Sequence, residues 1–417
     1  MYLTVKQQVK HLSKEEYQTL RELCQIARNL ANAAIYNVRQ YYFAEGKYLR
    51  YEDNYVLLKD SQEYKLLNAR MAQKVLKEVD GMFKNFFKVK KTAGQGRYSS
   101  KGMQLPGYFP KDALVPLVAD MAQIKDGVFL LPYSNAFRKT HAPVAIRVPP
   151  VLSGRRVREV RVIPRAGGRS FEVQYVHEQD GAPRELDKNH ALSLDFGVDN
   201  LVAAVSDEGK SFIIDGRRLK SMNQWFNQEN ARLQKIGEKQ GDGRQLTARR
   251  RALAGKWNRQ AADYMNKAAK LVVDYCVREG IGILVAGYNE TFRRNGNPET
   301  GRNGCDFVDI PFGRLRERLR RLCELNGIEY VEQEESYTSL ASFWDRDEIP
   351  EYNRDNPQSC TFSGERVHRG LYRTASGMEV NADINGALNI LRKSNVVGLE
   401  ALYSRGGVDT PVRIRIA

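Results

Sequence analysis

The residues of this chain best suited to chemistry are acidic side chains at the ends of predicted strands. Residues 191–200 (ALSLDFGVDN) predict a buried strand that runs into Asp195, followed by a turn at Gly197. A later predicted strand, residues 327–335, ends in an acidic run that includes Glu334 and Glu335. Carboxylates so close together repel one another unless a cation or a basic partner lies beside them. Hard divalent cations prefer carboxylate oxygens, so these residues could hold metal ions. The alternative is that they are polar, solvated strand ends.

The elements around these residues follow the order of an RNase H-like α/β fold. Strands at 201–205 and 211–214 follow Asp195 across tight turns and predict an antiparallel meander. A helical region, a strand, a helix, a strand and a last helix come next. We predict them at residues 217–280, 281–287, 311–323, 328–335 and from 381 onward, with a break at 240–243 and a loop at 293–302.

Three segments of this half resemble TnpB, the RNA-guided nuclease carried by insertion sequences, which is related to the type V CRISPR effectors and the eukaryotic Fanzor proteins. The segments are residues 193–201 (SLDFGVDNL), 334–339 (EESYTS) and 381–390 (NADINGALNI). The resemblance carries specific motifs over roughly residues 190–395. It extends to the N-terminal half only by general layout.

The N-terminal half predicts short strands around a helical insert. Strands at 2–10, 128–131, 144–148, 157–163 and 171–176 favour an antiparallel barrel. Ser13 and Glu16 have the spacing of a capping box at the start of a helix, and a second helix is expected from Tyr64 to about Lys90. The resemblance implies that the barrel is a wedge domain that grips guide RNA and that the insert is a recognition domain.

The expected fold class is therefore α/β plus β-barrel, with five parts. They are a wedge β-barrel at 1–10 and 105–188, a helical recognition insert at 11–104, an RuvC (RNase H-like) nuclease domain at 189–339 and 379–395, a degenerate zinc-ribbon-like insert at 340–378, and a loose tail at 396–417.

The resemblance implies a catalytic set of three carboxylates, Asp195, Glu335 and Asp383, that holds two Mg²⁺ ions. TnpB proteins often place a glutamate at the end of the strand at 281–287, where this chain has Ala286 and Gly287. Since neighbouring strands lie about 4.8 Å apart, a carboxylate at the end of the strand at 328–335 could reach the same site. We expect Glu335 to be this relocated ligand, with Glu334 as second choice. An acid is also favoured in a first helical turn by the helix dipole, which is the alternative for Asp383.

The resulting hypothesis is an RNA-guided, Mg²⁺-dependent endodeoxyribonuclease of the RuvC type, encoded by an insertion sequence. Two alternatives remain: an RNA-guided DNA-binding protein (a repressor) that has lost cleavage, and a guide-free transposase with the same fold. TnpB proteins usually carry a zinc ribbon after residue 339, but here only Cys360 and His368 remain, so no structural zinc is expected.

Composition favours a polyanionic partner. The chain has 66 Lys and Arg against 50 Asp and Glu, a formal net charge of +16. We expect guide RNA and double-stranded target DNA with a short adjacent motif as partners, and no membrane. The candidate nucleic-acid contacts are Arg155, Arg156, Arg249, Arg250, Arg251, Arg259 and Arg373. Five scattered cysteines without a Cys-x-x-Cys pair favour a cytoplasmic, nucleoid-associated protein. The sequence does not determine the oligomeric state.

Overall fold

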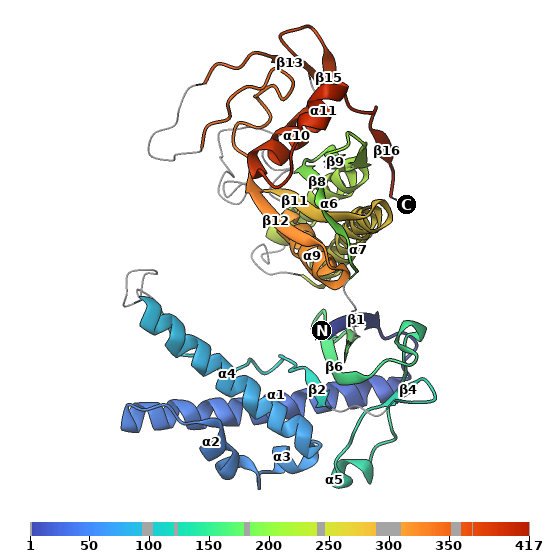
Figure 1. The fold of residues 1–417 in the computed structure, drawn as a ribbon. Helices are drawn as coiled ribbons and strands as arrows, with labels where there is room; N and C mark the ends of the chain where they lie inside the picture. The colour runs from blue at the N-terminus through green and yellow to red at the C-terminus, as the bar shows by residue number, and fades with distance from the viewer. Residues whose placement is uncertain are drawn as a thin grey trace. The chain divides into compact units, whose positions relative to one another are not determined.

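The computed structural model describes residues 2–93, 103–120, 124–178, 184–239, 247–288, 310–351, 360–368 and 370–416 (Figure 1). The chain divides into two compact units, residues 1–180 and 181–417. Each unit has its own hydrophobic core. The predicted break at 240–243 and the predicted loop at 293–302 both lie outside the described residues.

Helices form one part of the first unit. They are α1 (Lys14–Glu45), α2 (Tyr51–Leu58), α3 (Gln62–Leu66) and α4 (Ala69–Ala93). The predicted capping box is present: the Ser13 hydroxyl accepts from the Glu16 backbone N–H at 3.1 Å, and Glu16 accepts from the Ser13 N–H at 2.9 Å. The helix expected from Tyr64 is instead two helices, because Leu67 leaves the helical conformation.

Two small antiparallel sheets form the rest of this unit. One has the order β1-β7-β6-β2, and the other has the order β3-β4-β5. Their bounds are β1 Tyr2–Gln8, β2 Leu117–Asp120, β3 Ile124–Lys125, β4 Val128–Leu130, β5 Ala145–Arg147, β6 Val157–Arg165 and β7 Ser170–Glu178; α5 (Asn135–Arg138) and a 3₁₀ turn, η1 (Pro150–Leu152), lie between strands. The predicted strands are present, but β1 and β2 are the two edges of an open sheet. The described strands of this unit therefore form no closed barrel.

The second unit is built on a mixed six-stranded sheet with the order β12-β11-β8-β9-β10-β16. The strands are β8 Asp187–Phe196, β9 Asn200–Ser206, β10 Ser211–Asp215, β11 Ile281–Tyr288, β12 Glu329–Glu334 and β16 Val412–Ile414. The predicted meander is confirmed, since β9 pairs antiparallel with both β8 and β10. β11 lies parallel to β8 and β12, which brings the carboxyl ends of three strands to one edge of the sheet.

Helices cover both faces of this sheet (Figure 1). α7 (Ala248–Glu279) and α9 (Phe312–Asn326) pack on the face that carries Leu192, Leu194 and Leu284. α10 (Ala382–Ser394) packs on the face that carries Ala191, Val285 and other alternate residues. Because side chains alternate along a strand, Asp195 is on the face of α10. α6 (Arg217–Lys239) follows β10 directly.

The region between β12 and α10 forms a small antiparallel sheet of three described strands. They are β13 (Glu365–His368), β14 (Leu371–Arg373) and β15 (Glu379–Asn381). β15 ends at the residue that caps α10. β13 and β14 lie in the expected insert at 340–378, and β15 leads from it directly into α10, the helix that carries Asp383.

The expectation of a loose tail after residue 396 is wrong. This segment contains α11 (Glu400–Arg405) and β16, and β16 adds a parallel strand beside β10. Leu399 and Leu402 of the segment are buried against the α10 face of the sheet. Hydropathy gave little sign of this, because the strand that joins the sheet is only three residues long.

Candidate functional site

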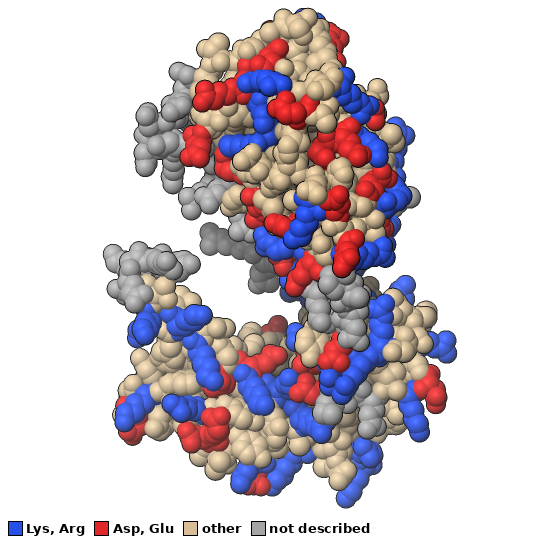
Figure 2. All heavy atoms as spheres, in the orientation of Figure 1, with Lys and Arg blue, Asp and Glu red and all other residues tan. Residues whose placement is uncertain are grey.

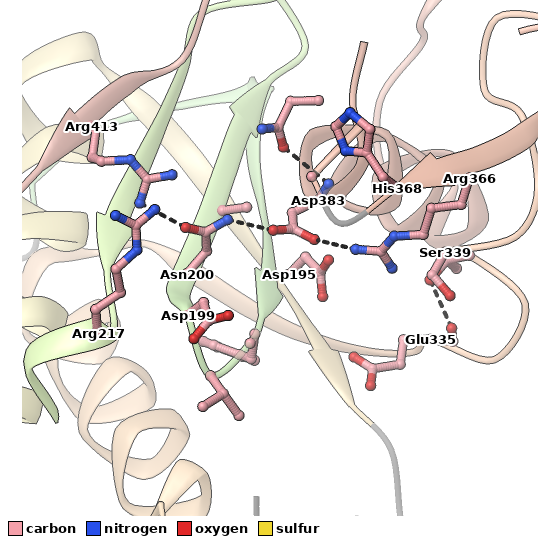
Figure 3. Close-up of a pocket in the computed structure, with 17 residues that line it drawn as sticks. Asp195, Asp199, Asn200, Arg217, Glu335, Ser339, Arg366, His368, Asp383 and Arg413 are labelled. Carbon is pink, nitrogen blue, oxygen red and sulfur yellow. Dashed lines mark hydrogen bonds and ion pairs between the residues drawn. The ribbon is translucent and has the colours of Figure 1, made fainter. Parts of the chain in front are cut away.

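A cleft of about 830 Å³ opens in the second unit beside the end of β8 and the segment that follows β12 (Figure 3). The three predicted carboxylates Asp195, Glu335 and Asp383 all line it. They come from the end of β8, the residue after β12 and the first turn of α10. In the close-up, the Asp195 carboxylate lies between the other two carboxylates.

The backbone of α10 leaves room for the carboxylate of Asp195. A Cβ added at Gly386 of α10 would lie 2.9 Å from Asp195 Oδ2, so glycine permits the helix to approach the acid. Burial raises the pKa of Asp195 well above its usual range, and the nearby charges of Glu335 and Asp383 raise it further. Arg366 acts in the opposite direction. The deprotonated form is therefore costly here without a compensating cation.

Glu335 occupies the space that a side chain at the end of β11 would otherwise take. A Cβ added at Gly287 would lie 2.7 Å from Glu335 Oε2. The Glu335 backbone N–H donates to Tyr288 O at 3.1 Å, which continues the pairing of β11 with β12 by one residue. Oε2 of Glu335 is buried and has no hydrogen-bond partner among the residues that the structure describes. Burial, and then the charge of Glu334, raise the pKa of Glu335 to about 7.

Glu334, the second-choice ligand, is hydrogen-bonded to other residues and does not line the cleft. Its Oε2 accepts from Lys393 Nζ of α10 at 2.6 Å, and its Oε1 accepts from the Ser336 backbone N–H at 2.7 Å. Burial acts to raise the pKa of Glu334, but these hydrogen bonds outweigh it and the pKa is lowered. Glu334 and Glu335 are thus neighbours in sequence with opposite electrostatic environments.

Asp383 is the most fully engaged of the three carboxylates. Its Oδ2 accepts from Asn200 Nδ2 at 2.5 Å, and its Oδ1 lies 3.3 Å from Arg366 Nη2. The helix start that carries it is capped by Asn381, whose side chain accepts from the backbone N–H groups of Asp383 and Ile384. The sequence did not identify Asn200 as a partner of Asp383, although Asn200 lies in the motif around Asp195.

Basic side chains stand on both sides of the cleft. Arg366 and His368 come from β13, and Arg217 and Arg413 come from the opposite side (Figure 3). Asp199 also lines the cleft and pairs with Lys220 at 3.0 Å. Sequence analysis missed Arg217 and Arg413 because nothing in the pattern around them indicates a site, and Arg413 falls in the expected tail.

The predicted nucleic-acid contacts lie elsewhere in the described part of the chain, since none of the seven lines this cleft. Arg155 and Arg156 are exposed just before β6, and Arg249, Arg251 and Arg259 are exposed on α7. Arg250 donates to Asn230 Oδ1 at 3.0 Å, which ties α7 to α6. Arg373 is 2.9 Å from Glu379 across the small sheet. Figure 2 shows Lys and Arg interspersed with acidic residues on the visible faces of both units.

The donor set of the cleft suits a hard divalent cation. Three carboxylates line the cleft. One has a buried oxygen without a hydrogen-bond partner in the described part of the chain, and another has an anionic form that burial and its acidic neighbours disfavour. As they stand, no three His, Cys, Asp or Glu side chains of the described residues converge closely enough to hold an ion. One oxygen of Asp383 is instead paired with Arg366, at 3.3 Å.

Two family models match the chain. The model OrfB_IS605, described as a probable transposase, matches residues 171–293, and the Cas12f1-like TNB domain matches residues 312–390. Both matches confirm the resemblance to the TnpB and Cas12f-like lineage. Among curated proteins, none matches this chain in sequence.

Solved structures share the architecture. A Cas12f1-sgRNA-target DNA complex aligns at a TM-score of 0.54 and 14% identity, covering 91% of this chain and 83% of that one. The mini-RNA-guided endonuclease CRISPR-Cas_phi3 aligns at a TM-score of 0.45 and 10% identity, covering 95% and 92%. The first of these likenesses shows that the chain shares its fold, with mixed α/β sheets, with the Cas12f1 chain. None of the described helices is both long and apolar enough to cross a membrane.

Proposed function

We propose that the protein is an RNA-guided DNA endonuclease of insertion-sequence type, which cuts guide-matched DNA in the cleft of its second unit. The observation that carries the proposal is the placement of Glu335. Its carboxylate lies where a residue-287 side chain would begin, while Asp195 and Asp383 line the same cleft. A glutamate missing from β11 is thus replaced in space by one from the end of β12.

In this proposal Asp195, Glu335 and Asp383 would be the residues that hold two Mg²⁺ ions. Bound Mg²⁺ supplies activation of water and neutralises charge that develops on a phosphate. The chain's own residues orient the ligands: Asn200 fixes one oxygen of Asp383, and the Gly386 position leaves space for the Asp195 carboxylate. Arg366, Arg217 and Arg413 supply positive charge along the cleft for the phosphates of a strand.

The first unit is proposed to bind the guide and the target duplex. Sequence would be read by base pairing with the guide, while the protein holds the backbone of the nucleic acid. Among the predicted contacts, Arg155 and Arg156 of this unit, and Arg249, Arg251 and Arg259 of the second unit, are exposed on the described surface. A wedge domain at 1–10 and 105–188, a recognition insert at 11–104 and a cytoplasmic location are parts of the same proposal.

One observation favours a second candidate function, an RNA-guided DNA-binding protein without cleavage. The described carboxylates do not converge on an ion as they stand, and Arg366 already neutralises Asp383. In this alternative the guanidinium takes the place of a metal ion permanently.

A cleavage assay distinguishes these two functions. The protein is expressed with its flanking non-coding DNA, the RNA that co-purifies is sequenced, and plasmid that matches the guide is incubated with the complex and Mg²⁺. Cleavage by the wild type, loss of cleavage in Glu335→Ala and retained target binding by that variant are expected. Glu329→Ala is the matched control, since Glu329 lies on the same strand but pairs with Lys188 at 3.1 Å, away from the cleft.

Intact plasmid with stable guided binding would instead establish the non-cleaving alternative. Cutting that is independent of any co-purifying RNA would indicate a guide-free transposase. Loss of cleavage in Glu334→Ala but not in Glu335→Ala would show that the other glutamate is the ligand.

A further inference from the structure

A row of hydrogen bonds connects the C-terminal strand to Asp383. Arg413 Nη1 of β16 donates to Asn200 Oδ1 at 2.8 Å, and Asn200 Nδ2 donates to Asp383 Oδ2 at 2.5 Å (Figure 3). The three side chains come from distant parts of the sequence. β16 also lies beyond residue 390, where the family match ends.

The sheet fixes the position of Arg413 at the start of this row. β16 pairs in parallel with β10, with Arg413 opposite Ile213. The Arg413 guanidinium lies 3.2 Å from Asp215 Oδ1 at the end of β10, and Asp215 is buried. Asp215 is in turn paired with Asn200 across β9 and β10, directly after a register shift between Ile214 and Asp215. The guanidinium is therefore anchored by one strand and directed at the first residue of another.

The turn that carries Asn200 is also held closely. A Cβ added at Gly197 would lie 2.8 Å from Asn200 O, and one added at Gly216 would lie 2.2 Å from Val198 O. The Gly216 N–H donates to Asp199 O at 2.8 Å. The backbone around Asn200 thus has little freedom, and the remaining variable is the orientation of its side-chain amide.

The amide orientation decides whether Asn200 attracts or repels Asp383. An asparagine presents an acceptor oxygen on one side and two N–H donors on the other. A donor from Arg413 on the oxygen leaves the N–H side facing the carboxylate, and polarisation along such a row strengthens each bond. Without that donor, the oxygen is free to turn toward Asp383, where it would repel the carboxylate.

We propose that Arg413 is a positioning residue for the nuclease site, acting through Asn200 on the carboxylate of Asp383. This inference rests on the proposed metal site of the cleft and adds that the C-terminal strand sets the geometry of one ligand. Arg366 bonds the other oxygen of Asp383, Oδ1. The hydrogen bonds from Arg413 through Asn200 therefore hold Oδ2 in place, and Oδ1 is the oxygen that would be released if a cation replaced Arg366. The C-terminal strand is thus part of the active centre, although it lies outside the matched family domains.

The affinity for Mn²⁺ provides the test, because it measures metal binding at the site without requiring cleavage. The affinity of full-length protein for Mn²⁺ is measured by electron paramagnetic resonance for the wild type, Arg413→Gln, Asn200→Ala and the double variant, with thermal unfolding alongside. Loss of a side chain that orients a metal ligand typically weakens metal binding by about 10–100-fold. We expect Arg413→Gln and Asn200→Ala each to weaken Mn²⁺ binding by roughly 10-fold, and the double variant to be no weaker than either.

Two further variants separate positioning from general charge or stability effects. Arg415→Gln removes the same charge from an exposed residue two positions along, and should leave Mn²⁺ binding unchanged. Arg413→Lys keeps a charged nitrogen donor and should recover most of the affinity. If Arg413→Gln is too unstable to measure, Arg413→Met, which keeps an apolar stem, takes its place.

Each outcome decides between the possibilities. Wild-type affinity in Arg413→Gln, or fully multiplicative losses in the double variant, would refute the action through Asn200 while leaving the metal site intact. Unfolding of both the Gln and Met variants would show that Arg413 is structural and overturn the inference. Equal Mn²⁺ binding by the wild type and Asp383→Ala would refute the proposed metal site itself, and the inference with it.

Discussion

Carboxylates in the N-terminal sheet and carboxylates in the cleft have opposite environments. On β6 and β7, Glu159 lies 3.0 Å from Lys74 and Glu172 lies 2.7 Å from Arg165. Burial acts to raise the pKa of each, but hydrogen bonds from basic neighbours outweigh it and the pKa is lowered. In the cleft, burial and neighbouring acids raise the pKa of Asp195 and Glu335 instead.

This difference separates acids that stabilise the fold from the acids that we propose as metal ligands. A paired carboxylate contributes to folding by being charged, whereas a buried carboxylate among other acids costs stability whenever it is charged. Such a cost persists in a protein when the charge has another use, and perturbed pKa values accordingly gather at functional sites. The comparison predicts that acid-to-amide substitutions have opposite effects on stability in the two regions.

The largest effect is expected for Asp195→Asn. The amide removes a proposed metal ligand, so cleavage should fall to background. The free energy of unfolding of the metal-free protein should rise, because a disfavoured charge is gone. Guided plasmid cleavage and thermal unfolding in EDTA measure the two effects. Retained cleavage, or reduced stability of the variant, would contradict the contrast between the two regions.

The next effect is expected for Gly386→Ala. Alanine is favoured over glycine inside a helix by about 1 kcal/mol, so stability should be maintained. The new Cβ would lie 2.9 Å from Asp195 Oδ2 and must displace that carboxylate. Mn²⁺ affinity and cleavage should therefore fall by at least about 10-fold. Gly398→Ala, where an added Cβ would meet nothing within 4 Å, is the control; an unchanged Mn²⁺ affinity in Gly386→Ala would argue that Asp195 is not a ligand.

A smaller effect is expected for the pair Lys393 and Glu334, which holds the residues on either side of Glu335. Lys393 Nζ bonds Glu334 at 2.6 Å and Ser336 O at 3.3 Å, so it ties this segment to α10. Lys393→Met should reduce cleavage by roughly 10-fold, in the range of residues that orient a ligand. The charge reversal Glu334→Lys with Lys393→Glu should restore part of it. Complete loss in Glu334→Gln would instead mark Glu334 as a ligand.

Glu335→Gln sharpens the comparison through the pH dependence of stability. The pKa of Glu335 in the folded protein is about 7, above its ordinary value of 4.5. Its contribution to stability is therefore present below pH 4.5 and is lost as the pH rises through 7. The metal-free wild type should lose about 1–3 kcal/mol relative to the Gln variant over that interval. Denaturant unfolding in EDTA at several pH values measures it, and parallel curves for the two proteins would disprove the shift.

The smallest effect is expected for Glu172→Gln in the first unit, and it has the opposite sign. The pKa of Glu172 is lowered, so its ion pair contributes stability above pH 4.5 and loses it as the pH falls through the folded value. Arg165 is 46% exposed, so solvent screening limits the loss to under about 1 kcal/mol at neutral pH. A stabilised variant at neutral pH would show that the N-terminal sheet does not differ from the cleft.

Local patterns determined most of the elements of this protein. The capping residues Ser13 and Glu16, the tight turns of the meander and the alternation of apolar residues each depend on neighbours in sequence, and the structure has them as expected. Asp195 could be named from its place at a strand end, whereas Asp383 was named because residues 381–390 resemble a TnpB motif. The closed barrel expected from the sequence is not formed by the described strands. Closure requires the edge strands of a sheet to pair, and β1 and β2, which are far apart in sequence, remain its two edges.

Only the tertiary structure brought distant side chains to one place. The space at Gly287 is filled by Glu335 because two parallel strands, joined through a helix, end side by side. Lys393 engages Glu334 across the packing of α10 on β12, and Arg413 reaches Asn200 because a three-residue strand joins the sheet at β10. Sequence fixes which residues can form a strand or a helix, but a contact between segments depends on how their faces pack, and no local pattern carries that information.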